Sequence, residues 1–180
     1  MENKKLRVCI IGAGFITGTQ HIPAINKLKE RLELAGVADC REDALIHLAK
    51  TYGIKNIYTD PMEMLDKEKP DLVHVCTANN THKYFTIEAL RRGANVLCEK
   101  PLALTLRDAQ EMLAEAKKAG KLLMTCQNSR IGAVQEMKKI VDSQELGEIY
   151  YTEIENIRRR GVPTWGRFHS AEDNLSLIHI

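Results

Sequence analysis

The sequence predicts an α/β protein in which a doubly wound, parallel-sheet Rossmann domain is followed by the start of an α+β domain. Short apolar segments alternate with segments of helical period through residue 126. Such alternation is typical of right-handed crossovers that place helices on both faces of a parallel sheet. A glycine turn follows the first apolar segment, and after residue 126 the pattern changes to one helix and one long alternating segment.

The first expected element covers residues 6–11, LRVCII, a nearly continuous apolar run that is typical of a strand buried on both faces. Gly12-Ala13-Gly14 ends this strand. A helix is expected over residues 16–29, with Pro23 in an irregular first turn. The following residues predict a strand over 32–39, a helix over 41–52, a short strand at 57–58 and a short helix over 61–66.

The second half of the sheet begins with a buried strand over residues 72–77, followed by a helix over 81–92 that Gly93 ends and a strand over 94–99. Thr105 then begins a helix through a capping-box pattern with Asp108, and Gly120 ends that helix. A strand over residues 122–126 completes the expected sheet.

These elements assign residues 1–126 to the Rossmann domain and residues 127–174 to the beginning of an α+β domain for substrate binding and oligomerisation. There we expect a helix over 132–143 and an antiparallel strand over 148–159, because alternation predicts one solvated face. One helix and one strand are too few for a domain, so we expect it to be truncated. Residues 175–180, LSLIHI, resemble a translated DNA-sequencing adapter, which predicts a non-native tail; the alternative is an ordinary apolar terminal strand.

The composition limits the classes of function. The net charge is +2, and Lys and Arg form no broad basic surface, which argues against nucleic-acid binding. No apolar run approaches the roughly 20 residues needed to cross a bilayer, so no membrane partner is expected. The five cysteines lie far apart without a C-x-x-C pair. We therefore expect reduced cytoplasmic thiols, and neither a disulfide nor a metal site.

The glycine turn and the end of the second strand together predict dinucleotide binding. Gly12 allows a tight turn, Gly14 allows a pyrophosphate to approach the backbone, and the next helix N-terminus offers free N–H groups. Asp39 follows at close to the spacing of about 20 residues expected for a carboxylate that binds the ribose hydroxyls. This anion favours NAD, although Arg41 leaves NADP open. The alternative is a simple glycine turn and a helix-capping Asp.

A polar segment, Thr77 to His82, follows the next buried strand and should lie at the same edge of the sheet. Thr77, Asn79 and His82 are candidate cofactor contacts. Asn80 or Thr81 could instead serve only as the cap of the following helix, and the two roles are compatible. A histidine in a first helical turn more often lies at the surface than in a catalytic site.

Four stretches resemble the glucose–fructose oxidoreductase / inositol dehydrogenase (Gfo/Idh/MocA) family: CIIGAGFITGTQHIPAI, GVADC, DLVHVCTANNTHKYFTIEALRRGANVLCEKPLALT and LGEIYYTEIENIRRRGVPTWGRF. The resemblance implies an NAD(P)-dependent oxidoreductase that acts on a hydroxyl or ketone of a sugar, cyclitol or related polyol, assembled as a homodimer or homotetramer. It also implies that Phe15 and Ile16, beside the glycine turn, contact the cofactor.

The sequence departs from the family pattern at three places. Thr17 replaces a common Gly or Ala, and Ala78 stands where the family usually has Pro in a T-P-N turn. The family's downstream D-x-x-x-H motif does not occur, so its proton-transferring His is absent. We therefore expect the 180-residue chain to be inactive alone.

The E-K-P stretch is the most specific part of the resemblance and contains the candidate catalytic residue, Lys100. Its amine could hydrogen-bond the substrate oxygen and stabilise the negative charge that develops as hydride leaves. Glu99 would orient the loop or balance charge, and Pro101, which often follows a cis bond in the family, would fix the direction of the amine. The alternative is a surface Lys at a strand end.

Candidate substrate contacts lie further along the chain, at Asn128, Arg130, Trp165 and Arg167, although a core Trp and solvated arginines are equally compatible with the sequence. Two other functions stay open. One is an NAD-dependent glycoside hydrolase of the same family, which oxidises the sugar transiently and returns the hydride. The other is a non-catalytic NAD-binding regulatory protein.

Overall fold

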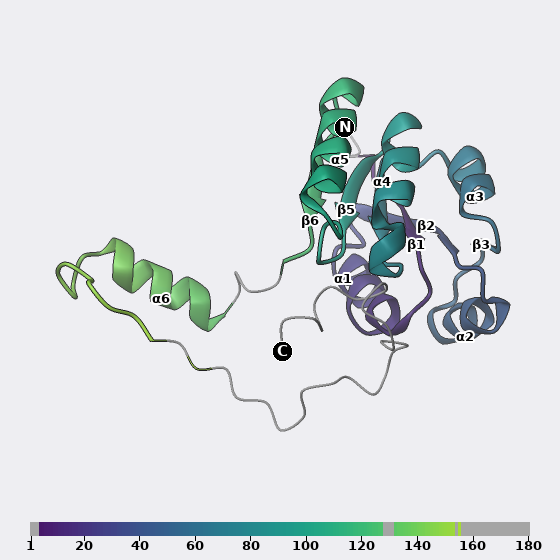
Figure 1. Ribbon diagram of the computed structural model, residues 1–180. Helices are drawn as coiled ribbons and strands as arrows, with labels where there is room; N and C mark the ends of the chain where they lie inside the picture. Colours follow the sequence, from purple (N-terminus) through teal and green to yellow (C-terminus); the bar gives the residue numbers. More distant parts are fainter. Residues whose placement is uncertain (1–3, 128–131, 154, 156–180) are drawn as a thin grey trace. The chain divides into compact units, whose positions relative to one another are not determined.

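The computed structural model describes residues 4–127, 132–153 and 155 (Figure 1). These residues belong to two compact units, of which the first ends at Cys126 and the second begins at Gln127. The predicted tail at residues 175–180 and half of the assigned α+β segment lie outside the described residues, so those assignments stay predictions. Within the described part of the chain, no helix has the length and apolar character of a membrane span.

The first unit contains a six-stranded sheet whose paired strands all run parallel. The strand order is β3-β2-β1-β4-β5-β6, which is the doubly wound order that the sequence predicts. The strands are β1 (Leu6–Ile11), β2 (Leu32–Ala38), β3 (Ile57–Tyr58), β4 (Leu72–Val75), β5 (Asn95–Cys98) and β6 (Leu123–Thr125).

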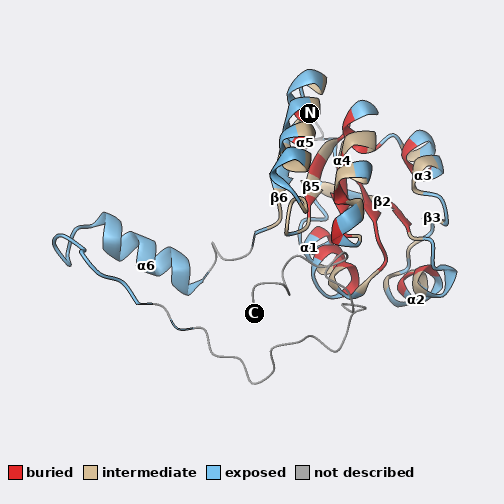
Figure 2. Ribbon diagram, in the orientation of Figure 1, coloured by how far each residue is buried: buried red, intermediate tan, exposed pale blue. Residues whose placement is uncertain are grey.

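Helices cover both faces of this sheet, as Figure 1 shows. On one face, α1 (Ile22–Lys27) and α2 (Glu42–Tyr52) pack against one cluster of buried side chains. On the other face, a second cluster includes residues of α3 (Pro61–Glu68), α4 (His82–Arg91) and α5 (Leu106–Ala119). The buried positions in Figure 2 follow the strands and the inner sides of these helices.

The two clusters explain why β1 is apolar throughout. Val8 and Ile10 belong to the cluster under α1 and α2, whereas Cys9 and Ile11 belong to the cluster under α3, α4 and α5. Successive side chains of a strand point to opposite faces, so a strand covered on both sides needs apolar residues at every inner position. The continuous run LRVCII therefore predicted a central strand correctly.

The helix expected over residues 16–29 has a different internal structure. It begins at Phe15, Thr17–His21 within it is a π-helix, and α1 continues from Ile22 with Pro23 in its first turn. Similarly, a short 3₁₀-helix at Asn79–Thr81 precedes α4. Both irregular segments follow strands at the carboxyl edge of the sheet, and π-helical turns occur frequently at functional sites.

The second unit contains α6 (Ala133–Asp142), close to the predicted helix over residues 132–143. The predicted strand over 148–159 is wrong in its described part, because residues 148–153 and 155 form no strand. An extended segment becomes a strand only when a neighbour accepts and donates its backbone hydrogen bonds. The described residues of this unit offer no such neighbour, so the alternating pattern has nothing to pair with.

The ends of α5 agree with the sequence. Thr105 has an extended backbone, and its hydroxyl accepts a hydrogen bond from the Asp108 backbone N–H at 3.1 Å. Lys117 and Lys118 lie in the last turn, and Gly120 ends the helix with a φ of +63°. This helix packs most closely on α4 and carries Met112, which is fully buried.

The N-cap of α5 generates a stability prediction. Replacing Thr105 with Ala leaves the Asp108 N–H without its partner, so the free energy of unfolding should fall by about 1 kcal/mol. Urea unfolding followed by circular dichroism measures the change. The matched control is Thr51→Ala, because the Thr51 hydroxyl only bonds the His47 carbonyl within α2. Equal effects of the two substitutions would contradict a specific capping role.

Candidate functional site

The turns that follow β1, β4 and β5 are joined by backbone hydrogen bonds at the carboxyl edge of the sheet. The Cys76 N–H donates to the Ile11 carbonyl at 2.8 Å, and the Glu99 N–H donates to the Val75 carbonyl at 2.9 Å. The strand order reverses between β1 and β4, and ligands of open α/β sheets bind outside the strand ends at such a point. The candidate residues therefore share the edge where a ligand is expected.

The two glycines of the first turn have different roles. Gly12 has a φ of +104°, and a Cβ there would lie 2.4 Å from the Cys76 carbonyl oxygen. Only glycine allows this backbone conformation and this approach to the turn after β4. Among the described residues, no atom beyond its chain neighbours lies within 4 Å of a Cβ built on Gly14. Its outer side is open, as backbone that approaches a pyrophosphate requires.

Thr17 replaces the third glycine of the fingerprint and gives the turn an additional hydrogen bond. Its side chain is fully buried, and its hydroxyl donates to the Gly12 carbonyl at 2.6 Å. The helix is thereby attached to the turn from which it starts. Phe15 is half exposed and Ile16 partly buried, so both remain candidate contacts beside the turn.

Asp39 connects the glycine turn to the end of β2. Its Oδ2 accepts the Ala13 N–H at 2.7 Å, and its Oδ1 accepts the Arg41 backbone N–H at 2.8 Å and the Arg41 Nε at 3.2 Å. Partial burial raises the pKa of this carboxyl, but the hydrogen bonds from Arg41 and Ala13 outweigh it and hold the pKa below its usual value. Asp39 is therefore an anion that also shapes the turn.

The turn after β4 is fixed by Thr77 and His82. The Thr81 hydroxyl donates to the Thr77 hydroxyl at 2.8 Å, and Asn79 is buried in the 3₁₀-helix. His82 is fully buried, with Nδ1 at 2.8 Å from the Pro101 carbonyl and Nε2 at 3.1 Å from the Thr77 carbonyl. The surface position that the sequence favoured for His82 is wrong.

Burial also changes the interpretation of His82 as a cofactor contact. A ring between two backbone carbonyls positions the Thr77 turn against the turn after β5, and it offers no exposed atom to a nucleotide. Burial lowers the pKa of His82, so the ring is neutral and donates one N–H at a time. Its contribution to a ligand site is therefore indirect.

The turn after β5 holds the candidate catalytic residue. Lys100 is exposed, and its peptide bond to Pro101 is cis. The backbone N–H of Lys100 donates to Oε2 of Glu99 at 3.1 Å, and Oε1 of Glu99 lies 2.8 Å from Nε2 of His21. Burial raises the pKa of Glu99, but these hydrogen bonds outweigh it and keep the pKa below its usual value.

A buried pair of histidines lies behind Glu99, and sequence reasoning missed it. Nδ1 of His21 is 3.0 Å from Nδ1 of His74, and the side chains are 5% and 6% exposed. Burial and the neighbouring His21 lower the pKa of His74 to about 3, so that ring is neutral. The signal was present in the strand LVHVC, because a polar residue inside a buried strand usually has a specific partner.

The remaining candidates cannot be placed. Asn128, Arg130, Trp165 and Arg167 lie outside the described residues.

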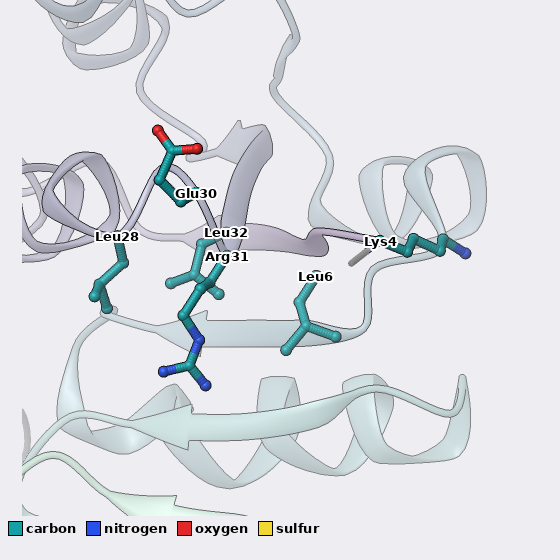
Figure 3. Close-up of a pocket in the computed structure, with 6 residues that line it drawn as sticks. All are labelled: Lys4, Leu6, Leu28, Glu30, Arg31 and Leu32. Carbon is teal, nitrogen blue, oxygen red and sulfur yellow. The ribbon is translucent and has the colours of Figure 1, made fainter. Parts of the chain in front are cut away.

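A separate hollow of about 360 Å³ lies at the opposite edge of the sheet, where Leu6 begins β1 and Leu32 begins β2 (Figure 3). Its position at the amino ends of the strands separates it from the glycine turn and from Lys100.

The chain is similar to known proteins over most of its length. The model of the oxidoreductase family with an NAD-binding Rossmann fold (Gfo/Idh/MocA) matches residues 6–127. D-glucoside 3-dehydrogenase of Escherichia coli strain K12 is 40% identical over 173 residues, which are 96% of this chain and 49% of that protein. Myo-inositol 2-dehydrogenase of Thermotoga maritima is 35% identical over 144 residues, which are 80% of this chain and 42% of that protein. The chain thus spans about half the length of these curated relatives.

Solved structures give the same result. The WlbA dehydrogenase of Bordetella pertussis, in complex with NADH and UDP-GlcNAcA, matches with a TM-score of 0.76 and 29% identity, over 82% of this chain and 45% of that chain. Myo-inositol 2-dehydrogenase of Lactobacillus plantarum matches with a TM-score of 0.75 and 28% identity, over 81% of this chain and 43% of that chain.

The glycine turn generates a second prediction. Gly12→Ala forces a Cβ into the Cys76 carbonyl and strains the backbone, so the free energy of unfolding should fall by about 2 kcal/mol or more. Gly14→Ala is the matched control, because its Cβ meets nothing, and its effect should stay within about 0.5 kcal/mol. Thermal and urea unfolding of both variants measure this difference. A Gly12→Ala protein as stable as the Gly14→Ala protein would contradict the proposed close approach.

Proposed function

Because this chain belongs to the oxidoreductase family with an NAD-binding Rossmann fold, we propose that the whole protein transfers a hydride between NAD and a hydroxyl-bearing carbon of a sugar or cyclitol. The observation that carries the proposal is the position of Lys100. It follows β5 at the same edge of the sheet as the Gly12 turn after β1 and Asp39 after β2.

The glycine turn is suited to the pyrophosphate of the cofactor. The open side of Gly14 leaves room for phosphate oxygens, and the helical segment that starts at Phe15 would direct its first N–H groups and its positive dipole end toward them. The Thr17 hydroxyl is already bonded to Gly12, so it holds the turn rather than the ligand. Phe15 and Ile16 are proposed to line the same space.

The Asp39 and Arg41 pair is proposed to receive the adenosine ribose. Asp39 accepts hydrogen bonds from Ala13 and from Arg41, so a ribose hydroxyl can bind the carboxylate only by displacing the Arg41 guanidinium. The Arg41 side chain is 47% exposed, and an ion pair of this kind at the surface is weak, so the exchange requires little free energy. The retained anion favours NAD over NADP.

Lys100 is proposed to act on the substrate oxygen. When bound, NAD would supply the hydride acceptor for the carbon that carries the hydroxyl. The Lys100 amine hydrogen-bonds that oxygen and stabilises the negative charge that develops on it as the hydroxyl proton passes to solvent. Glu99 accepts the Lys100 N–H and His82 contacts the Pro101 carbonyl, so the backbone on both sides of the Lys100 side chain is held in place.

The substrate class follows from the relatives. One is named for position 3 of a D-glucoside and another for position 2 of myo-inositol. Both names describe a hydroxyl on a polyhydroxylated ring, which supports a cyclic sugar or cyclitol as the substrate here. Assembly of the whole protein as a homodimer or homotetramer, and substrate contacts from Asn128, Arg130, Trp165 and Arg167, are part of the same proposal.

Binding and turnover test this function separately. Isothermal titration of the folded 180-residue chain with NAD should show one site, and the whole protein should form NADH with members of a panel of glucosides and inositols. A glycosidase activity that recycles NAD would instead favour the hydrolase, and NAD binding without turnover would favour a regulatory protein. Failure of the folded chain to bind NAD or NADP would overturn the proposal.

Lys100 generates the third prediction. In the whole protein, Lys100→Met should lower kcat by roughly 100-fold or more, because the variant cannot hydrogen-bond the reacting oxygen. The dissociation constant for NAD should change little, since the glycine turn and Asp39 are untouched. Lys117→Met, at an exposed position in the last turn of α5, is the matched control and should leave both quantities unchanged. Unchanged turnover of Lys100→Met would remove this residue from the mechanism.

A further inference from the structure

Three potential metal ligands meet at the carboxyl edge although they lie far apart in the sequence. They are His21 at the end of the π-helix, Glu99 after β5 and Cys126 after β6. One ligand atom from each residue lies within 4.8 Å of the other two. His21 is buried, whereas Glu99 and Cys126 are partly exposed, so the cluster has a solvent-facing side.

The three ligand atoms are near enough to one another for small side-chain adjustments to bring them to the spacing of a tetrahedral zinc site. Bond lengths of about 2.0 to 2.3 Å from zinc to nitrogen, oxygen and sulfur place ligand atoms roughly 3.3 to 3.6 Å apart. His21 Nε2 and Glu99 Oε1 are now 2.8 Å apart, as a shared proton requires. An ion that replaces this proton needs the two atoms to separate by about half an ångström, which a side-chain adjustment can supply.

The partners behind the cluster suit metal ligation. Nδ1 of His21 faces Nδ1 of His74 at 3.0 Å, so His21 can donate its Nδ1–H there and direct the lone pair of Nε2 toward an ion. Glu99 accepts the Lys100 N–H with Oε2, which leaves Oε1 on the side of His21. Two of the three ligands are thus oriented by groups other than the ion.

We propose that His21, Glu99 and Cys126 form a three-ligand binding site for a zinc-class divalent cation, with the fourth position open to solvent. Imidazole, carboxylate and thiolate are ligands that zinc accepts together, whereas magnesium and calcium prefer oxygen ligands alone. Binding replaces the proton between His21 and Glu99 and removes the proton of the Cys126 thiol, so both protons pass to solvent.

The site is independent of the proposed hydride transfer, which uses none of these residues as an ion ligand. Its position still gives it a consequence for that chemistry. Glu99 precedes Lys100 directly, so an ion on the Glu99 carboxylate places a divalent positive charge beside the candidate catalytic amine. The cysteine spacing in the sequence gave no indication of this site, because the three ligands come together only through the parallel order of β1, β4, β5 and β6.

Cobalt(II) substitution tests the proposal on the folded 180-residue chain, reduced with a non-thiol reagent. Titration with Co²⁺ should produce one equivalent of a thiolate-to-cobalt charge-transfer band and the strong visible absorption of four-coordinate cobalt. Zn²⁺ should displace the cobalt and abolish both signals. This readout depends on neither NAD nor turnover, so its failure would leave the proposed oxidoreductase function intact.

Matched variants identify the ligands. Cys126→Ser should abolish the charge-transfer band, and His21→Gln should weaken cobalt binding at least tenfold, with circular dichroism confirming that each variant is folded. Cys40→Ser is the control, because Cys40 is an exposed thiol that follows β2 and lies outside the cluster. The proposal is wrong if the folded wild-type chain gives no thiolate band, or if that band survives in Cys126→Ser.

Discussion

The parallel pairing of β1 with β4 is the constraint on which the site depends. It brings the Cys76 N–H to the Ile11 carbonyl at 2.8 Å and carries the Gly12 backbone so close to the Cys76 carbonyl that no Cβ fits between them. Because the strand order reverses here, the segments that leave β1 and β4 cover opposite faces of the sheet. The edge between them is left for a ligand.

Two carboxylates at this edge accept hydrogen bonds from backbone N–H groups in addition to carrying negative charge. Asp39 accepts the Ala13 N–H of the glycine turn, and Glu99 accepts the N–H of Lys100. Each also has a partner side chain, Arg41 for Asp39 and His21 for Glu99. Removing either carboxylate would therefore change the shape of a turn and the local electrostatic field at the same time. Loss of ligand binding in such a variant would not by itself identify a direct contact between the carboxylate and the ligand.

The sequence predicted what depends on local pattern and missed what depends on assembly. The run LRVCII indicated a strand covered on both faces, and the Thr105 cap and Gly120 end of α5 were visible in the residues themselves. His74 was visible as a polar residue in a buried strand, but its partners His21 and Glu99 could not be predicted, because the three residues come from elements that only the strand order joins. The strand expected over 148–159 failed for a related reason, since alternation cannot supply a pairing partner.

The backbone around Lys100 is held in a defined position although its side chain is exposed. Glu99 fixes the Lys100 N–H, and the buried His82 contacts the Pro101 carbonyl while also reaching the Thr77 turn. These contacts restrict the backbone and leave the amine accessible. A catalytic lysine requires an accessible amine and a backbone that is already ordered. The ordered backbone has lost its conformational freedom on folding, so substrate binding does not carry that entropic cost. The polar residues behind the turn therefore contribute to the chemistry proposed for Lys100 through position, without touching the substrate.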